Sequence, residues 1–272
     1  MLVDRRTALT AGGATALGGL PWRSARAQAA NTIKIGLLSD MSGPYRDING
    51  PVSLACTRLA IQEFGARGFQ VEMISADHQN RPDVALNIAR QWYDREGVDM
   101  ILNLAASSVA LAVAELTREK NKVTIATSTA SSDMTGRACT PNSLHWSYDT
   151  YMVSKSTGGA TVRAGGDTWF FITADYAFGH ALERDTLGLQ TAAGIVCTES
   201  FYWDLNDRTR SLMRRVHALS GPAAMGMSHA GDYSGTLHYL KAVADLGIQK
   251  AKASGADIVA RMKAMPTDDD AF

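Results

Sequence analysis

Short apolar segments alternate with amphipathic segments from residue 33 onward. The apolar segments are of strand length, and the segments between them carry apolar residues at helical spacing. The predicted strands are 33–38, 71–75, 100–104 and 123–127, and the predicted helices are 52–64, 83–95 and 108–120. This alternation predicts an α/β fold with a parallel sheet covered by helices on both faces. Such sheets bind ligands at the carboxyl ends of their strands.

The same rhythm continues to residue 186 and then breaks. We expect a short strand at 144–148, a helix at 150–164 capped by Thr150, an apolar strand at 168–173 and a helix from about Gly179. A strand at 194–200 and helices at 207–219, 232–246 and 256–265 follow, with 224–228 as a possible strand between the first two helices. The chain ends in a polar segment without a closing strand.

The N-terminus has the layout of a secretory signal. The twin arginines Arg5 and Arg6 precede a mild apolar run at 8–20, and 27–29 supplies the small residues that a signal peptidase needs. The run is too short to span a bilayer. We therefore expect a Tat-type signal peptide at 1–29 that is removed on export to the periplasm.

Charge and cysteine content narrow the function classes. The chain has 27 basic and 27 acidic residues; the signal takes four arginines and one aspartate, which leaves 23 basic and 26 acidic. A nearly neutral, slightly acidic chain of this kind gives no indication of a basic surface that would bind nucleic acid. Histidine and cysteine do not cluster at metal spacing, so we expect no metal and no cofactor. A Cys56–Cys139 bridge and free thiols at all three cysteines, Cys197 included, are both open.

Catalytic motifs are missing as well. The sequence has no GxSxG elbow, no HExxH and no glycine-rich phosphate loop after a strand. We therefore expect no catalytic residues. An exported α/β protein of this kind is more suited to capturing a small molecule than to transforming one.

Five segments together resemble one family. They are 39–45 (SDMSGPY), 76–83 (ADHQNRPD), 145–151 (HWSYDTY), 173–180 (TADYAFGH) and 201–207 (FYWDLND). The chain resembles the type I periplasmic substrate-binding proteins of ABC importers, in the group that binds leucine, isoleucine and valine. The resemblance implies two lobes, each a doubly wound parallel sheet, with a ligand cleft between them. It also implies an inner-membrane ABC permease as partner, and a monomeric receptor.

The sequence departs from this family after the helix that contains 183–185. Residues 187–194 resemble a much later family segment, and the closing C-terminal strands of the family are not recognisable. We interpret this as an internal deletion with a C-terminal truncation. By the resemblance, lobe I is 31–149 plus 206–272, and lobe II is an incomplete 150–205. A lobe this small buries little core.

A carboxylate site is expected where the third strand meets its helix. Free amides at that helix start, together with the hydroxyls of Ser107 and Ser108, favour an anion. Relatives hold the ligand's α-carboxylate with the matching serine and with the loop that corresponds to Ser128, Thr129 and Ala130. Ordinary helix capping by the serines is the alternative.

Aromatic and acidic residues complete the expected cleft. We expect Tyr45, Trp146 and Phe178 to contact the ligand, with Phe178 where relatives stack a tyrosine on the ligand side chain. The acidic residue that binds an ammonium group in relatives lies in the stretch that is missing here, and Asp149 and Asp175 are candidate substitutes. Aspartate before a helix is also a common cap. The aromatic loops favour an apolar or aromatic carboxylate.

The predicted function is the periplasmic solute-binding component of an ABC importer for a small carboxylate, either a branched-chain amino acid or an aromatic acid. The alternatives are a truncated remnant without transport function and an amide or amino-acid sensor of the same fold. An exported enzyme is the least supported hypothesis, because no motif places a nucleophile beside a base.

Overall fold

The computed structural model describes residues 31–65, 67–166, 168–188 and 200–272. The predicted signal peptide, Cys197 and all but the last residue of the predicted strand at 194–200 lie outside the described residues.

A five-stranded parallel sheet forms the centre of the molecule, in the order β2-β1-β3-β4-β5. The sheet reverses its winding between β1 and β3, which is the place where doubly wound sheets open a crevice for ligands. Its strands lie within a few residues of their predicted positions. They are β1 (Thr32–Ser39), β2 (Gln70–Asp77), β3 (Met100–Asn103), β4 (Val123–Ala126) and β5 (Ser143–His145).

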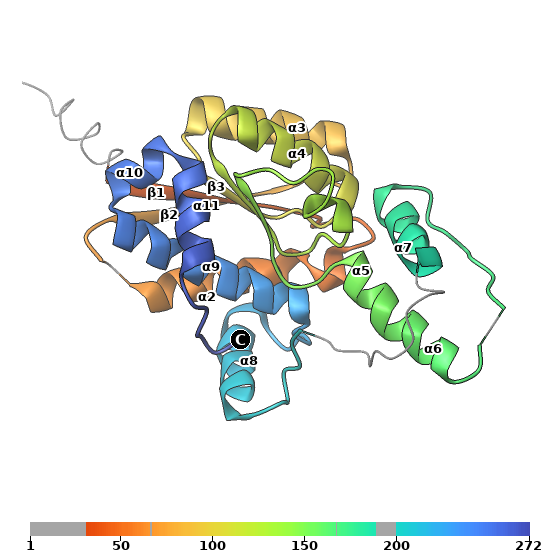
Figure 1. Cartoon of the computed structure of the whole chain (residues 1–272). Coiled ribbons are helices and arrows are strands. Elements are labelled where there is room, and N and C mark those ends of the chain that lie inside the picture. Colours follow the sequence, from red (N-terminus) through yellow and green to blue (C-terminus); the bar gives the residue numbers. More distant parts are fainter. Residues whose placement is uncertain (1–30, 66, 167, 189–199) are drawn as a thin grey trace, which may run out of the picture.

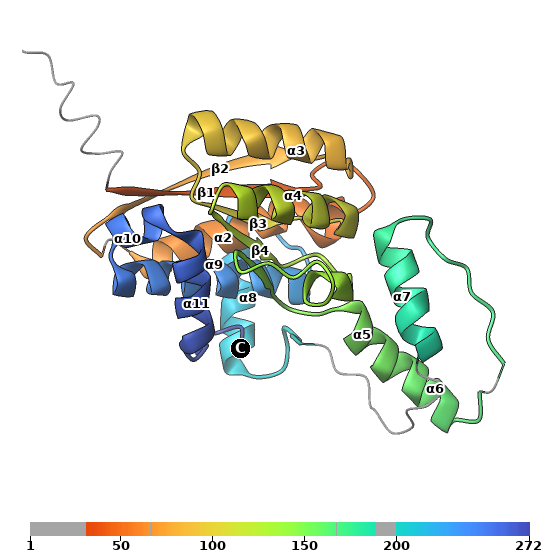
Figure 2. The ribbon, with the colours of Figure 1, turned by 45° about the horizontal axis from the view of Figure 1, so that its top comes forward.

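Helices cover both faces of this sheet (Figures 1 and 2). One face carries α3 (Pro82–Gln91), which continues into a π-helical turn (Trp92–Glu96), and α4 (Ser107–Glu119). The other face carries α2 (Gly50–Phe64), α9 (Met227–Leu246), α10 (Ile248–Ala253) and α11 (Gly255–Ala264), with α8 (Asp207–Ser220) packed against α2. Short 3₁₀ turns occur at Arg46–Ile48 and Ser132–Met134.

The alternation of side chains along β1 explains how the two layers form. Ile33, Ile35 and Leu37 point into the cluster with α9 and α11, while Leu38 points into the cluster with α3 and α4. The glycine at position 36 matters because a Cβ there would come within 2.5 Å of the Trp92 ring. The absence of a side chain at this position lets the indole lie flat on the strand.

A separate arm extends beyond β5 (Figure 2). It consists of α5 (Thr150–Val153), a π-helical turn (Ser154–Gly158), α6 (Gly159–Arg163) and α7 (Ala177–Leu187). The first helix begins where expected, but its cap is Asp149, which accepts the Met152 N–H at 2.7 Å. The predicted cap Thr150 instead uses its hydroxyl to bind Asp185 and the Ser132 N–H.

The predicted strand at 168–173 does not form. This segment is irregular, and Phe170 and Ile172 are 89% and 94% exposed. A strand needs a neighbour for its backbone hydrogen bonds, and the described part of the arm, 150–166 and 168–188, offers no second strand. The sequence shows that 168–173 has the composition of a strand, but it does not show that a neighbouring strand is missing. The second sheet of the predicted architecture is therefore absent from these described residues.

The C-terminal region differs from prediction in two ways. The possible strand at 224–228 is an irregular segment that ends in the first turn of α9, which starts five residues earlier than predicted because His229 accepts the Gly226 N–H through Nδ1. The polar C-terminal segment packs rather than extends: Asp269 is buried and accepts the Ser234 hydroxyl at 2.7 Å.

Cys56 and Cys139 are free thiols, the first buried in α2 and the second exposed. The bridge considered for them is therefore not formed. Within the part of the chain that the structure describes, no helix has both the length and the apolar character needed to cross a lipid bilayer.

Candidate ligand site at the carboxyl edge of the sheet

The first turn of α4 supplies backbone donors at the carboxyl edge of the sheet. Its N-cap, Ala106, has extended backbone and no side chain that could bind the first amides of the helix. Ser107 is buried, and its Oγ accepts the Ser131 N–H at 3.1 Å, whereas Ser108 is half-buried. The start of α4 therefore keeps its positive end without a capping side chain, and the Ser108 hydroxyl lies beside it.

The loop after β4 runs past the same turn. The Thr129 hydroxyl donates to the Leu104 carbonyl at 2.7 Å, and Thr129 is fully buried. Ser128 and Ala130 are 5% and 4% exposed. Thr129 thus fixes the loop to the strand end. The Ser128 hydroxyl of this loop has a neighbour that can donate to it.

That neighbour is Asn103, at the end of β3. Its Nδ2 lies 3.0 Å from Ser128 Oγ and 3.0 Å from Oδ2 of Asp232 on α9. Asn103 and the following Leu104 both have positive φ, at 85° and 59°. Two consecutive residues of this kind are strained unless their surroundings hold them, and such strain concentrates at functional sites.

Asp232 is fully buried beneath this edge. Burial raises its pKa to about 7, against the lowering effect of hydrogen bonds from Ser53, Thr127 and Asn103. Its neighbour His229 is also buried, and burial lowers the pKa of that imidazole to about 4. The floor of the site is therefore a polar network that is sealed from solvent.

Three tyrosines connect the sheet edge with the arm. The hydroxyls of Tyr45, after β1, and Tyr176, before α7, are hydrogen-bonded to each other. Burial raises the pKa of Tyr148, after β5, and its charge interaction with Tyr45 raises it further. Phe178 lies in the first turn of α7, with its ring centroid 5.9 Å from that of Tyr176. These rings bring aromatic surface and hydroxyl groups to the junction between the sheet edge and the arm.

A polar contact holds α7 against the sheet edge. Asp185 accepts hydrogen bonds from the hydroxyls of Thr150 at 2.6 Å and Ser132 at 2.7 Å. Arg184 pairs with Asp133 at 3.2 Å and with Asp185 at 3.1 Å. Because these partners lie on the loop after β4 and on α5, they fix the position of α7 and of the aromatic residues at its start.

Two predicted ligand contacts are placed elsewhere. Trp146 packs against the core beneath the sheet, with its ring 5.3 Å from that of His238 on α9. The side chain of Asp175 is 99% exposed and pairs with His180 at 3.1 Å. Trp146 is thus half-buried against the core on the side of α9, and Asp175 is turned to solvent.

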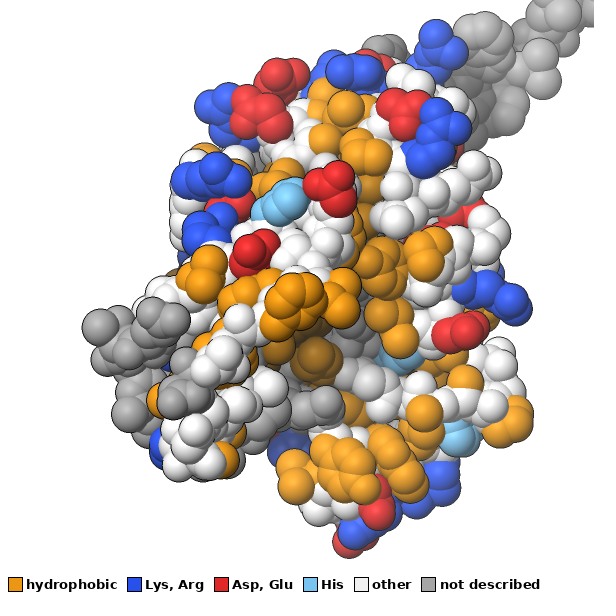
Figure 3. Space-filling model, turned by 90° about the vertical axis from the view of Figure 1, so that its right-hand side faces the viewer, with side chains coloured by type: hydrophobic (Ala, Val, Ile, Leu, Met, Phe, Trp, Pro, Cys, Tyr) orange, Lys and Arg blue, Asp and Glu red, His pale blue; other side chains and the backbone are white. Residues whose placement is uncertain are grey.

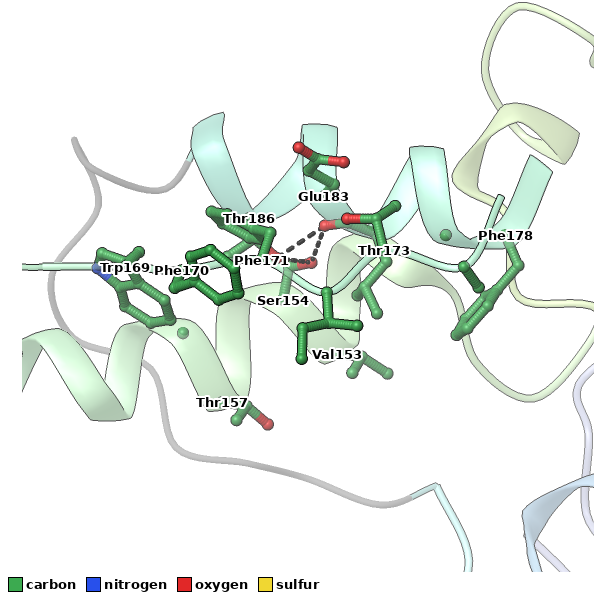
Figure 4. Close-up of a pocket in the computed structure, with 15 residues that line it drawn as sticks. Val153, Ser154, Thr157, Trp169, Phe170, Phe171, Thr173, Phe178, Glu183 and Thr186 are labelled. Carbon is green, nitrogen blue, oxygen red and sulfur yellow. Dashed lines mark hydrogen bonds between the residues drawn. The ribbon is translucent and has the colours of Figure 1, made fainter. Parts of the chain in front are cut away.

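The arm also contains an apolar hollow of about 380 Å³ (Figure 4). Phe171 and Phe178 line it from one side and Val153 and Thr157 from the other, while Thr186 binds Ser154 at 3.0 Å at its edge. The hollow lies between α5, α7 and the irregular segment 168–173. Figure 3, seen from the side of the arm, shows the molecule hollowed there and rimmed by hydrophobic side chains.

The residues that sequence reasoning missed are polar and buried. Asn103 and Asp232 are not among the predicted site residues, although a lone aspartate within the small-residue segment 230–235 of a buried helix is an identifiable signal. No group of three or more potential metal ligands occurs among the residues that the structure describes.

Comparison with known proteins agrees with this architecture. A family model described as periplasmic binding protein matches residues 32–187 and 183–272. A periplasmic binding protein of Burkholderia mallei has 29% identity and a TM-score of 0.80, over 89% of this chain and 84% of that one. A branched-chain amino acid ABC transporter periplasmic ligand-binding protein of Burkholderia xenovorans LB400 has 26% identity and a TM-score of 0.74, over 88% and 84%.

A more distant structure shares the fold. A solute-binding protein of an ABC transporter from R. palustris, solved in complex with benzoate, has 16% identity and a TM-score of 0.75, over 86% of each chain. A search of curated proteins gives no match. The family model covers nearly all of the described residues, and the α/β fold with its parallel sheet agrees with it. This chain therefore belongs to the periplasmic binding protein family.

Proposed function

We propose that this protein is the solute-binding component of an ABC importer and that it captures a small carboxylate between the sheet edge and the arm. The observation that carries the proposal is the first turn of α4, which has no capping side chain and lies beside the half-buried Ser108. A helix start of this kind favours an anion without needing a formal positive charge.

The proposed ligand contacts come from both sides of the junction. Ser107, Ser108 and the loop Ser128, Thr129 and Ala130 would receive the carboxylate, with Ser108 and Ser128 supplying hydroxyl donors. Tyr45 and Phe178 would contact the rest of the ligand, because they lie where α7 meets the sheet. An apolar body with a few convergent polar groups is typical of small-molecule sites.

The acid we favour has no ammonium group. In relatives of the leucine-binding group a carboxylate of the second lobe binds that group. Here Asp149 caps α5 and Asp175 is turned to solvent, so neither is placed to do so. An aromatic or branched apolar acid therefore fits these residues better than the corresponding amino acid.

The lobes and the cellular setting belong to the same proposal. Lobe I would be 31–149 with 206–272, and lobe II a reduced 150–205 shortened by an internal deletion. Two observations support this division: the family model matches the chain in two parts that meet at 183–187, and the described part of the arm has no sheet. The protein would be exported by its N-terminal signal, act as a monomer and deliver ligand to an inner-membrane permease.

The proposal is tested by ligand-dependent thermal unfolding of the chain without residues 1–29. The panel contains benzoate, 4-hydroxybenzoate, 4-methylpentanoate, L-leucine and benzamide; benzoates are included because a protein of the same fold was solved with benzoate. A carboxylate at 100 times its Kd stabilises the folded state by about 2.7 kcal/mol. Acids should raise the melting temperature and benzamide should raise it less.

Two variants connect that result to the site. Ser108→Ala should remove most of the acid-dependent shift, whereas Ser220→Ala, at the end of α8, should leave it unchanged. A cooperative transition that no acid moves would instead support a remnant without transport function. A shift with benzamide but not with benzoate would favour an amide sensor.

A further inference from the structure

The amide of Asn103 lies at the centre of the buried network below Ser128. Five acceptor atoms lie within 3.2 Å of its single Nδ2: Ser128 Oγ at 3.0 Å, Asp232 Oδ2 at 3.0 Å, Ser53 Oγ at 3.1 Å, Asp232 Oδ1 at 3.2 Å and Asn49 Oδ1 at 3.2 Å. An amide nitrogen carries only two hydrogens. The amide can therefore bond to only two of these acceptors at a time, and the others need different donors.

The carboxylate of Asp232 decides how the two hydrogens are used. Both carboxyl oxygens of Asp232 lie within 3.2 Å of Nδ2, and the group can accept in either protonation state, so one hydrogen goes to Asp232. Ser53 and Thr127 are hydroxyls that donate to Asp232 themselves, so they do not need the amide. The second hydrogen is then available to Ser128 Oγ.

A hydroxyl that accepts a hydrogen bond from below must direct its own proton elsewhere. With Asn103 bonded to its oxygen, the Ser128 hydroxyl keeps its own proton free to donate to a ligand at this loop. Without Asp232, the Asn103 amide is free to bond Asn49 or Ser53 instead, and Ser128 loses this constraint.

We propose that Asp232 is a positioning residue of the anion site, acting through Asn103 to orient the hydroxyl of Ser128 toward a bound carboxylate. This inference rests on the proposed function, since it needs an anion at that site. Asp232 itself does not touch the ligand, because it is fully buried on α9 and lies two hydrogen bonds behind Ser128.

The arrangement also gives the site a dependence on pH. A bound carboxylate and an ionised Asp232 repel each other, so the anion binds more tightly when Asp232 is protonated. The pKa of Asp232, raised by burial to about 7, places this change between pH 6 and 8. The affinity for an acid should fall as the pH rises through that range, and the affinity for an uncharged amide should not.

Three ionisable groups near Asp232, namely His229, Cys56 and Tyr233, do not account for such a change. Burial lowers the pKa of His229 to about 4 and raises the pKa values of Cys56 and Tyr233 well above neutrality. Other ionisable groups on the elements packed there include Glu63 on α2, His238 on α9 and Asp269 in the C-terminal segment.

The test is calorimetric titration of the chain without residues 1–29 with benzoate and with 4-methylpentanoate at pH 6, 7 and 8, with benzamide as the uncharged control. For the unmodified protein, the Kd of the acid that binds should rise threefold to tenfold from pH 6 to pH 8. A shift of one pKa unit on binding corresponds to about fivefold over this pH range. The Kd of benzamide should stay constant.

Three variants identify the group responsible. Asp232→Asn keeps an acceptor for Asn103 but cannot ionise, so its Kd should be the same at all three pH values. Thr127→Val removes a hydroxyl that stabilises the ionised carboxylate and should move the midpoint to higher pH; it also serves if Asp232→Asn does not fold. Asp269→Asn removes another buried carboxylate from the surroundings of α9 and should keep the original pH dependence.

The outcomes separate the two proposals. If the acid binds and Asp232→Asn retains the pH dependence, the role of Asp232 is refuted while the proposed function stands. If Thr127→Val leaves the midpoint unchanged, the role of Asp232 is refuted in the same way. If neither acid binds the unmodified protein at any pH, the proposed function and this inference both fail.

Discussion

Asn103 and Asp232 lie 129 positions apart in the sequence, yet the side-chain nitrogen of Asn103 is 3.0 Å from the carboxylate of Asp232. The contact joins the end of β3 to the N-terminal part of α9, directly below the loop that carries Ser128. A buried carboxyl group in this position affects the stability of the folded chain as well as the chemistry at the sheet edge.

The first prediction concerns the pH dependence of stability. The pKa of Asp232 is about 7 in the folded protein and near 3.8 in an unfolded chain. Between these values the folded state holds a proton that the unfolded state has released, so this group's contribution to stability is lost as the pH rises from about 4 to 7. Asp232→Asn should therefore gain stability relative to the unmodified protein over that range, on the order of 2–4 kcal/mol by pH 8.

Denaturant unfolding of both proteins at pH 4, 5, 6, 7 and 8 measures this difference. His229 acts in the opposite direction, since its pKa is lowered to about 4 and its contribution is lost as the pH falls from about 6.5 to 4. The difference between the two proteins isolates Asp232 from that effect. A difference that stays constant from pH 4 to 8 would contradict the buried, titrating carboxyl group.

The second prediction concerns how α7 is held. Asp185 accepts hydrogen bonds from Ser132 and Thr150, so Asp185→Ala leaves these hydroxyls and Arg184 without their main partner. The loss of about 2 kcal/mol of docking energy should speed amide exchange in α7 on the order of 30-fold. Hydrogen–deuterium exchange measures this directly.

The matched control is Asp175→Ala, which removes an exposed aspartate just before the same helix. It should leave the exchange of α7 unchanged. Equal exchange in both variants would mean that α7 is held by other contacts.

The third prediction concerns the exposed apolar face of the arm. Phe170 and Ile172 border the hollow between α5 and α7 but are 89% and 94% exposed, whereas Phe171 in the same lining is half-buried. Exposed apolar residues on an extended, unpaired segment promote aggregation. The double variant Phe170→Ser, Ile172→Ser should raise the concentration at which the protein aggregates and change its stability by less than about 0.5 kcal/mol.

Light scattering over a concentration series, together with thermal unfolding, checks both parts. Phe171→Ser is the control, and it should destabilise the arm because the side chain is half-buried. If the double variant destabilises the protein as much as Phe171→Ser does, the two side chains are not exposed in solution.

The fourth prediction concerns the packing of β1. A methyl group at position 36 would meet the Trp92 ring at 2.5 Å, so Gly36→Ala should destabilise the protein by about 1–3 kcal/mol. A Cβ at position 188 meets no atom within 4 Å, so Gly188→Ala should have little effect. Urea unfolding of the pair tests whether the indole lies on the strand, and equal stabilities would exclude that packing.

The sheet and its helices were predictable from sequence because their signal is local. β1, β3 and β4 are buried on both faces and read as continuous apolar runs, and α2, α3 and α4 show helical spacing between them. The family resemblance and the fold are confirmed, and membership of a family of binding proteins confirms the expectation of a binding protein rather than an enzyme.

The failures all depend on partners distant in sequence. Residues 168–173 have strand composition but find no strand beside them in the described residues. The contact of Trp146 with His238 from α9 also joins residues distant in sequence, and the proposed ligand contact of Trp146 stays a prediction. Asn103 and Asp232 form their buried hydrogen bond only when the fold brings β3 and α9 together. Local pattern predicts where an element forms, while its neighbours decide whether a strand pairs, an aromatic is buried or a carboxyl group keeps its proton.

The most direct test of the account is calorimetric titration of the chain without residues 1–29 with benzoate and 4-methylpentanoate, for the unmodified protein, Ser108→Ala and Ser220→Ala. The account predicts binding of at least one acid by the unmodified protein and by Ser220→Ala, with an affinity at least tenfold lower for Ser108→Ala. Equal affinity in all three proteins, or heat of binding in none of them, would contradict an anion site at the start of α4.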